Sequence, residues 1–203
     1  MARRPFFNFK KGNNMRFNQM MIQYSAPTIC NIKSGNLFFA RNNTFSSSSF
    51  IEWKKDLYRY GISAFSLQLS ENSTAILVLN ICWARKILDD IFVKAYLLEK
   101  GYKTKGAFEF VNELFSRMKD IQGFPHEVGI ILGYPLEDVI EFENNQGKNC
   151  KYCGLWKSYS DVETARLCKC RFTECSHLCK NWYNEGYSLS QIINEYKKLN
   201  YSA

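Results

Sequence analysis

The chain has 203 residues, of which 46% are hydrophobic and 23% charged, and its formal net charge is +8. This composition supplies one sizeable core and excludes a wholly disordered chain. The longest apolar run, residues 75–84, is interrupted by Asn80 and falls short of the roughly 20 residues that cross a bilayer. No apolar block with a cleavage site follows the basic start. We therefore expect a cytoplasmic protein with no membrane span.

The positive charge is concentrated at the two ends of the sequence. Residues 1–20 hold five bases and no acid, and residues 147–180 hold seven bases and three acids. Bases interleaved with aromatic rings are typical of proteins that contact phosphates and stack on nucleobases, although a basic terminus can also be a solvated extension. The predicted nucleic-acid-binding residues are Arg3, Arg4, Lys10, Lys11, Arg16, Lys148, Lys151, Lys157, Lys169 and Arg171, with Tyr152 and Trp156 as stacking rings.

After the arm of residues 1–20, the sequence predicts a short helix and then extended chain. We place the helix over residues 18–24. Residues 26–40 contain a turn signal at residues 34–36, which indicates two extended segments. The polar run at residues 41–49 indicates a loop.

A helix and a β-hairpin come next. Ser49 and Glu52 form a capping-box pattern at the start of the helix, and Gly61 ends it. Residues 62–70 alternate in polarity, and residues 75–82 are apolar enough for a buried strand. A turn between the two strands completes the hairpin.

The rest of the chain predicts helices. Apolar residues at helical spacing predict one helix over residues 83–100 and a second over residues 107–118. Short helices joined by tight turns follow, through the cysteine-rich stretch, to a last helix over residues 188–199, where Ser188 and Gln191 repeat the capping box. The predicted fold class is α+β, with early strands and a helix-rich C-terminal half.

Residues 124–142, FPHEVGIILGYPLEDVIEF, form a specific block. Pro125 suits a helix start, and the Gly-Tyr-Pro sequence at residues 133–135 forces a stop and a restart, so we expect two short helices at an angle. With SAPTICNIKSGNLFF upstream and GLWKSYSD downstream, the block resembles an uncharacterised bacterial family, a domain of unknown function common in anaerobes, over about residues 23–196. The resemblance implies one intracellular unit and no particular activity.

Six of the eight cysteines fall in one stretch near the C-terminus. A two-residue gap followed by glycine points two sulfurs at one ion, and a second pair from the following residues completes a tetrahedral set. The predicted metal ligands are Cys150, Cys153, Cys168, Cys170, Cys175 and Cys179. We predict structural zinc in a cysteine-rich helical module, residues 147–203, packed on an α+β core of residues 21–146.

Two alternatives remain for these thiols. An iron–sulfur cluster uses the same ligands in a reduced cell, and several of the cysteines could instead be ordinary buried side chains. Cys30 and Cys82 lie in strand-like apolar runs, so we predict that both belong to the core.

His126 and Glu127 are the weak candidates for a catalytic site. A carboxylate beside a neutral imidazole suits general acid–base chemistry, whereas two residues in a first helical turn also suit a capping role. The zinc-protease pattern of two histidines around a glutamate is absent, because Ile130 is the fourth residue after His126. We see no glycine-rich phosphate loop or nucleophile elbow either, so the balance leans away from an enzyme.

The leading hypothesis is a metal-stabilised basic protein that binds nucleic acid or a nucleoprotein. One alternative is a redox protein or small-molecule enzyme, using an iron–sulfur cluster or the site at His126 and Glu127. Another is a protein-interaction module without chemistry, for which the aromatic content of 16% offers anchors.

Overall fold

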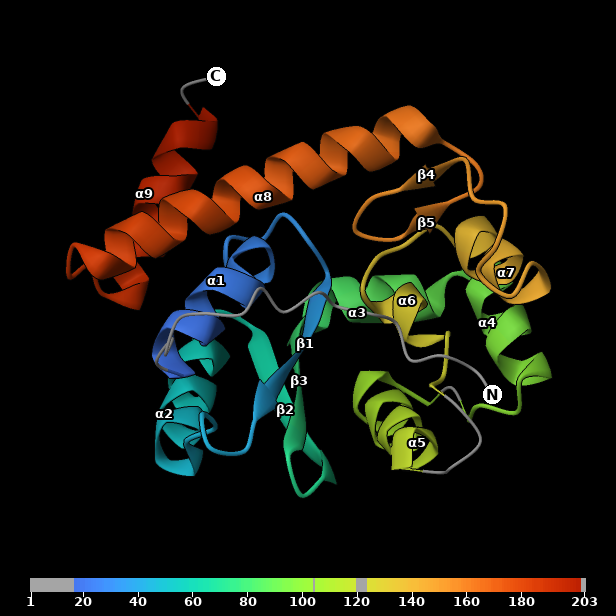
Figure 1. Ribbon diagram of the computed structural model, residues 1–203, viewed down its shortest axis with the longest axis horizontal. Helices are drawn as coiled ribbons and strands as arrows, with labels where there is room; N and C mark the ends of the chain where they lie inside the picture. Colours follow the sequence, from blue (N-terminus) through green and yellow to red (C-terminus); the bar gives the residue numbers. More distant parts are fainter. Residues whose placement is uncertain (1–16, 104, 120–123, 202–203) are drawn as a thin grey trace.

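A three-stranded antiparallel sheet lies at the centre of the fold (Figure 1). The computed structural model describes residues 17–103, 105–119 and 124–201. The strands are β1 (Gly35–Arg41), β2 (Ile62–Ser70) and β3 (Ser73–Asn80), in the order β1-β3-β2. The β2–β3 pair is the predicted hairpin, and the α+β fold class is confirmed.

The central strand β3 is buried on both faces. Its side chains alternate, so that Ile76 and Val78 enter one buried cluster while Ala75, Leu77 and Leu79 enter another. Because helices cover both faces of the sheet, both sets of side chains must be apolar. This explains why the sequence of β3 is a continuous apolar run.

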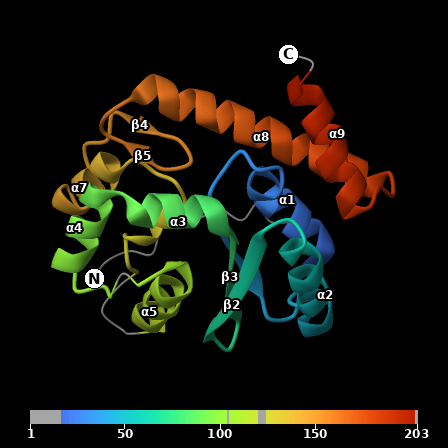
Figure 2. The same cartoon turned by 180° about the vertical axis from the view of Figure 1, so that it is seen from behind.

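Two groups of helices cover the sheet. The group on the face of Ile76 consists of α1 (Phe17–Ile29), α2 (Ser47–Tyr58), α8 (Val162–Asn184) and α9 (Leu189–Tyr201). The group on the opposite side consists of α3 (Ile81–Asp89), α4 (Ile91–Glu99), α5 (Ala107–Lys119), α6 (Val128–Ile131) and α7 (Leu136–Asn144). A small hairpin, β4 (Tyr152–Cys153) with β5 (Lys157–Ser158), precedes α8. Figures 1 and 2 show α8 running along one edge of the molecule, from this hairpin to α9.

The predicted helix over residues 18–24 is longer in the structure, and the prediction of extended chain from residue 26 is wrong for its first part. Helix α1 continues through Pro27 to Ile29, and residues 25–29 are all buried. Proline removes one backbone donor, but this loss falls in the last turn, where packing of the helix outweighs it. The strand that follows begins inside the predicted turn, at Gly35.

The single helix predicted over residues 83–100 is two helices. Asp90 is extended, with ψ of 134°, and its side chain accepts hydrogen bonds from the backbone N–H groups of Phe92 and Val93. It therefore ends α3 and caps α4. The start predicted for α2 is also displaced along the chain. Its N-cap is Ser46, three residues before the predicted Ser49.

The cysteine-rich stretch is not a series of short helices, since α8 is one helix of 23 residues. Asp161 caps its start by accepting a hydrogen bond from Thr164 N at 3.0 Å. The buried side chains of α8 are Ala165, Cys175 and Cys179, so cysteines occupy the positions where aliphatic residues normally mark a helical face.

Three other predictions agree with the structure. The helix over residues 107–118 is α5, and the two short helices around the Gly-Tyr-Pro sequence are α6 and α7. The capping box at the last helix forms, with Gln191 Oε1 accepting from Ser188 N at 2.9 Å.

Within the residues described, no helix is long and apolar enough to cross a membrane. The predicted arm residues Arg3, Arg4, Lys10, Lys11 and Arg16 lie outside the described residues.

Candidate functional site

Three buried cysteines from distant parts of the chain meet between α1 and α8. Cys30 directly follows α1, while Cys175 and Cys179 lie one turn apart on α8. Their sulfurs all lie within 4.8 Å of one another, and the Cys30 and Cys179 sulfurs are 3.5 Å apart. Exposure is 6% for Cys30 and 0% for the other two. We call these three residues the thiol group.

The thiol group favours one thiolate. Hydrogen bonds from Cys175 and Cys30 lower the pKa of Cys179 to about 5. The pKa of Cys30 is raised, first by its hydrogen bonds with Cys175 and Cys179 and then by burial. Two thiols that donate to a third sulfur stabilise its charged form in an apolar setting.

The thiol group could bind a metal ion. A tetrahedral ion with metal–sulfur bonds of about 2.3 Å separates its sulfurs by about 3.8 Å, which agrees with the close approach of these thiols. Thiolates select soft ions such as Zn²⁺ and Cu⁺. In the described part of the chain, this is the one set of three or more potential ligands found together.

The other predicted ligands are not part of the thiol group. Cys150 and Cys153 form a separate pair beside β4, with their sulfurs 3.1 Å apart. Cys168 and Cys170 lie on α8 without joining either set. The proposed union of the Cys150 pair with two thiols of α8 is therefore not found among the described residues.

Cys30 was missed as a candidate ligand because nothing local distinguishes it. Cys30 is buried, as predicted. It meets Cys175 and Cys179, which follow it by 145 and 149 residues, only because α1 packs against α8. The companion prediction for Cys82 is wrong, since that side chain is exposed on α3.

A cavity of about 670 Å³ lies between the two groups of helices. Its walls come from the C-terminal part of α1, strand β1, the α6–α7 segment, the β4–β5 hairpin and the middle of α8. Tyr134 and Trp156 form an aromatic wall, because their rings stack 4.9 Å apart. A volume of this size is typical of sites for small organic molecules.

Lys33 brings a buried positive charge to the cavity. The side chain is 7% exposed, and its Nζ lies 5.3 Å from the ring centre of Tyr134 and 5.8 Å from that of Phe172. Burial lowers the pKa of the Lys33 ammonium to about 8. Within the described residues, no carboxylate lies within 4.0 Å of this nitrogen.

The one acid among the described residues that line the cavity is already saturated. Asp138 is 2% exposed and accepts hydrogen bonds from Trp156 Nε1 at 2.6 Å, from the backbone N–H groups of Tyr159 and Ser160 at 2.8 Å, and from Ser160 Oγ at 2.9 Å. These donors hold the pKa of the Asp138 carboxyl below its usual range against the opposing effect of burial. The Asp138 carboxylate therefore holds the aromatic wall and the hairpin and does not pair with Lys33. Among the described residues Lys33 has no carboxylate partner, and the Cys168 thiol on α8 is the one group whose charge raises the Lys33 pKa, against the larger opposing effect of burial.

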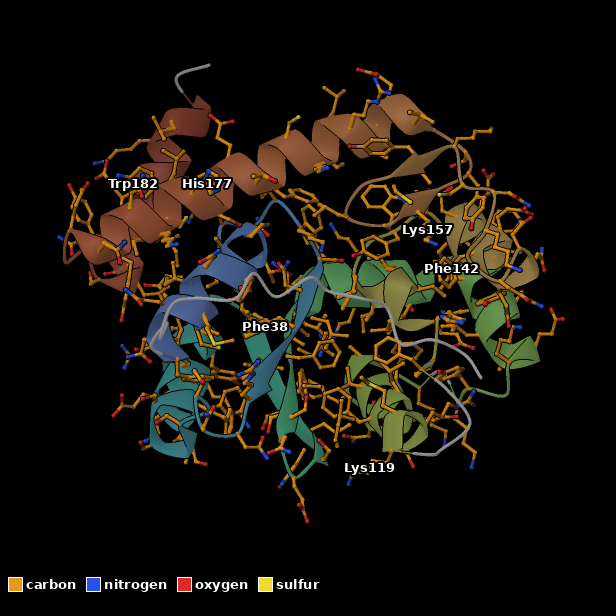
Figure 3. All side chains as sticks on the ribbon, viewed as in Figure 1. Phe38, Lys119, Phe142, Lys157, His177 and Trp182 are labelled. Atoms are coloured by element: carbon orange, nitrogen blue, oxygen red, sulfur yellow. The ribbon has the colours of Figure 1, made fainter. Side chains whose placement is uncertain are left out.

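Both histidines of the chain lie at the rim of the cavity. His126, just before α6, and His177, on α8, are both exposed and both line it. The His126 ring lies 4.7 Å from that of Phe142, which also lies beneath Lys157 Nζ at 5.7 Å. Figure 3 shows Lys157 and Phe142 together, with His177 on α8.

The structure places His126 and Glu127 in different surroundings, and their catalytic role stays a prediction. Glu127 is buried and does not line the cavity. It precedes α6 but makes no capping hydrogen bond with its side chain. His126 instead contacts Phe142 at the cavity, and its charge also acts on the Glu143 carboxylate of α7.

The predicted basic residues divide into two places. Lys148, Lys151, Lys169 and Arg171 are exposed, whereas Lys157 lines the cavity and donates a hydrogen bond to Gly147 O. Tyr152 lies beneath two cations, with Arg166 Cζ at 5.4 Å and Lys169 Nζ at 5.8 Å from its ring centre. Trp156 is half-buried at the cavity, where Tyr134 stacks on one face of its ring.

The three segments that carry the family resemblance all reach the cavity. The upstream segment supplies Lys33, the central block supplies His126 and Tyr134, and the downstream segment supplies Trp156 and Lys157. No curated protein and no solved structure matches the chain. The model of a family described as protein of unknown function (DUF3793) matches residues 21–193, a range that includes the described lining of the cavity and the thiol group. The chain therefore belongs to the DUF3793 family of proteins of unknown function.

Proposed function

We propose that the protein binds a small organic anion with an apolar or aromatic body in the cavity. The observation that carries this proposal is the Lys33 ammonium, which is buried at the cavity wall without a carboxylate partner among the described residues. Burying an unpaired charge costs several kcal/mol unless a partner arrives. A ligand anion is the partner that would complete this site.

The neighbouring side chains suggest what else the ligand carries. The stacked rings of Tyr134 and Trp156, with Phe172 opposite, offer flat apolar surface for an aromatic or aliphatic body. His126 and His177 at the rim offer hydrogen bonds to polar groups nearer to solvent. The site is therefore one for an amphipathic molecule whose anionic end enters first.

A matched pair of fluorescent probes tests this proposal. Anilinonaphthalene sulfonate carries an anion on an aromatic body, and N-phenylnaphthylamine has the same rings without the charge. A hydrogen bond or ion contact to a charged group contributes about 1.5 to 3 kcal/mol, so Lys33→Met should weaken sulfonate binding roughly 10- to 150-fold. The uncharged probe should bind both proteins equally, and Lys169→Met, at an exposed site, should change neither affinity. Equal sulfonate affinities for the wild type and Lys33→Met would exclude the proposal.

Nucleic-acid binding, the leading hypothesis from the sequence, stays a second candidate. What favours it is the cluster of Tyr152 with Arg166 and Lys169, neither of which makes an ion pair in the described part of the chain. A ring flanked by cations suits stacking on a base beside phosphates. Binding of a fluorescent single-stranded oligonucleotide should weaken as salt rises, and Arg166→Gln with Lys169→Gln should flatten that dependence. No binding at low salt would remove this candidate.

For the thiol group we propose zinc in a structural role, in a protein of the reducing cytoplasm. Zinc suits thiolate ligands and needs no redox partner, and thiols stay reduced in that compartment. An iron–sulfur cluster, the alternative, is normally held by four cysteines. Elemental analysis of protein purified without oxygen, with its visible spectrum, separates the two. About one zinc and no colour supports zinc, whereas iron with sulfide and visible absorbance refutes it.

A further inference from the structure

One short turn connects the thiol group to the cavity. Cys30 stands at its start, and Lys33 follows three residues later. The backbone between them is fixed, because the N–H groups of Ile32 and Lys33 both donate to Pro27 O, at 2.9 and 3.2 Å. Cys30 and Lys33 are therefore joined by a hydrogen-bonded turn with no long linker between them.

The next residue ties the same turn to the aromatic wall. Ser34 Oγ donates to Ile131 O at 2.8 Å, and Ser34 O accepts from Asn80 N at 2.8 Å. Ile131 lies three residues before Tyr134, the ring beneath Lys33. The turn thus contacts the thiol group at one end and the α6–α7 segment at the other.

Helix α8 makes the second connection. It carries Cys175 and Cys179 of the thiol group, and it also carries Phe172, whose ring centre lies 5.8 Å from Lys33 Nζ. Phe172 and Cys175 are three residues apart, so they lie on the same side of the helix. The two elements that meet at the thiols are therefore the two that place Lys33 and Phe172.

We propose that a soft metal ion bound by Cys30, Cys175 and Cys179 organises the cavity, so that the ion and the organic anion bind cooperatively. This inference rests on the proposed function of the cavity. Cys179 binds the ion as the thiolate, while Cys30 and Cys175 each lose a proton to solvent as their metal–sulfur bonds form. The filled site replaces a thiol contact of 3.5 Å with bonds that join the turn to α8. With the turn of Lys33 and helix α8 held by the ion, less conformational entropy is lost when the organic anion binds.

The size and symmetry of the effect follow from linkage. Coupling between two sites in proteins is commonly about 1–3 kcal/mol, which corresponds to about 5- to 150-fold in affinity. We expect about a tenfold increase in the affinity for anilinonaphthalene sulfonate when Zn²⁺ is bound. Because coupling is reciprocal, a saturating concentration of the sulfonate should raise the affinity for Zn²⁺ by the same factor.

The experiment uses the full chain, freed of metal by a chelator under anaerobic conditions. Sulfonate affinity is measured by fluorescence with and without Zn²⁺ for the wild type, Cys30→Ser and Cys150→Ser. Zn²⁺ should tighten sulfonate binding to the wild type and to Cys150→Ser, which keeps the thiol group, and should have no effect on Cys30→Ser. The reciprocal Zn²⁺ titration is made on Cys150→Ser, which keeps the thiol group and removes one sulfur of the pair at the cavity, so it decides the question even where Cys30→Ser does not fold.

The outcomes separate this inference from the proposed function. If Zn²⁺ binds but leaves sulfonate affinity unchanged, or if Cys30→Ser responds like the wild type, the coupling is refuted while the cavity site stands. Absence of Zn²⁺ binding also refutes it. If sulfonate binding is independent of Lys33 with and without Zn²⁺, the proposed function itself fails.

Discussion

Replacement of Lys33 by methionine is expected to stabilise the protein in the absence of ligand. Methionine keeps the length of the side chain and removes the buried charge. The pKa of Lys33 falls from 10.5 to about 8 because burial disfavours the ammonium. At about 1.4 kcal/mol for each pKa unit, the charged side chain costs the fold at most about 3.5 kcal/mol.

Contacts of the ammonium with the rings of Tyr134 and Phe172 offset part of this cost, since cation–π contacts contribute about 0.5–2 kcal/mol. We therefore expect Lys33→Met to raise the free energy of unfolding at pH 7 by about 1–3 kcal/mol. For a chain of this length, that corresponds to an increase in Tm of roughly 2–12 °C.

The stability difference between the wild type and Lys33→Met should depend on pH. The pKa of Lys33 is lower in the folded state than in the unfolded state, so the cost is fully present below pH 8 and disappears as the pH approaches 10.5. The wild type should thus gain stability relative to Lys33→Met over this range. Other titrating groups affect both proteins equally, so they do not contribute to the difference between the two free energies of unfolding.

Urea denaturation followed by circular dichroism at pH 7 and pH 10 measures the effect. Lys169→Met serves as the matched control, because that lysine is exposed and its replacement should change stability by less than about 0.5 kcal/mol. A Lys33→Met protein that is less stable than the wild type at pH 7, or an advantage that is undiminished at pH 10, would refute the account of Lys33 as a buried charge without a carboxylate partner.

Three further predictions concern the cavity and its support. Asp138→Asn should destabilise the protein by about 2–4 kcal/mol in urea titrations at pH 7, because it removes a buried charged acceptor of the Trp156 indole. The pKa of Asp138 is lowered in the folded state, so the difference in stability between the two proteins should shrink as the pH falls below about 4. Gly35→Ala should lower stability by about 1–3 kcal/mol in thermal melts, because the added Cβ would lie 2.5 Å from Leu79 Cδ2; an unchanged Tm would contradict this contact. Sulfonate affinity, measured by calorimetry, should fall as the pH rises through about 8, where Lys33 loses its proton; a flat profile between pH 7 and pH 10 would contradict the role of the ammonium.

Much of the fold follows from local sequence. The β2–β3 hairpin, α5 and the capping box at α9 were predictable because period and caps lie within each element. Asp90 divides a periodic apolar run by capping α4, a choice that the apolar pattern alone does not reveal. Helix α8 was not predicted as one helix, because cysteines take the place of aliphatic residues on its buried face.

Most of the candidate site could not be predicted from the sequence, because tertiary packing brings its residues together. The predicted ligand Cys175 meets Cys30 only because α8 packs on α1, across 145 residues of sequence. Lys33 stands in a turn where nothing local marks it as buried. The family-like segments were the best available signal, because they supply Lys33, Tyr134 and Trp156 to one cavity.

The most direct test of the central claim is the ratio of the sulfonate dissociation constants of Lys33→Met and the wild type, measured at pH 7. The account predicts a ratio of about 10 or more, with N-phenylnaphthylamine binding both proteins equally. A ratio near one, or an equal loss of both probes, would contradict the assignment of the cavity as an anion site completed by Lys33.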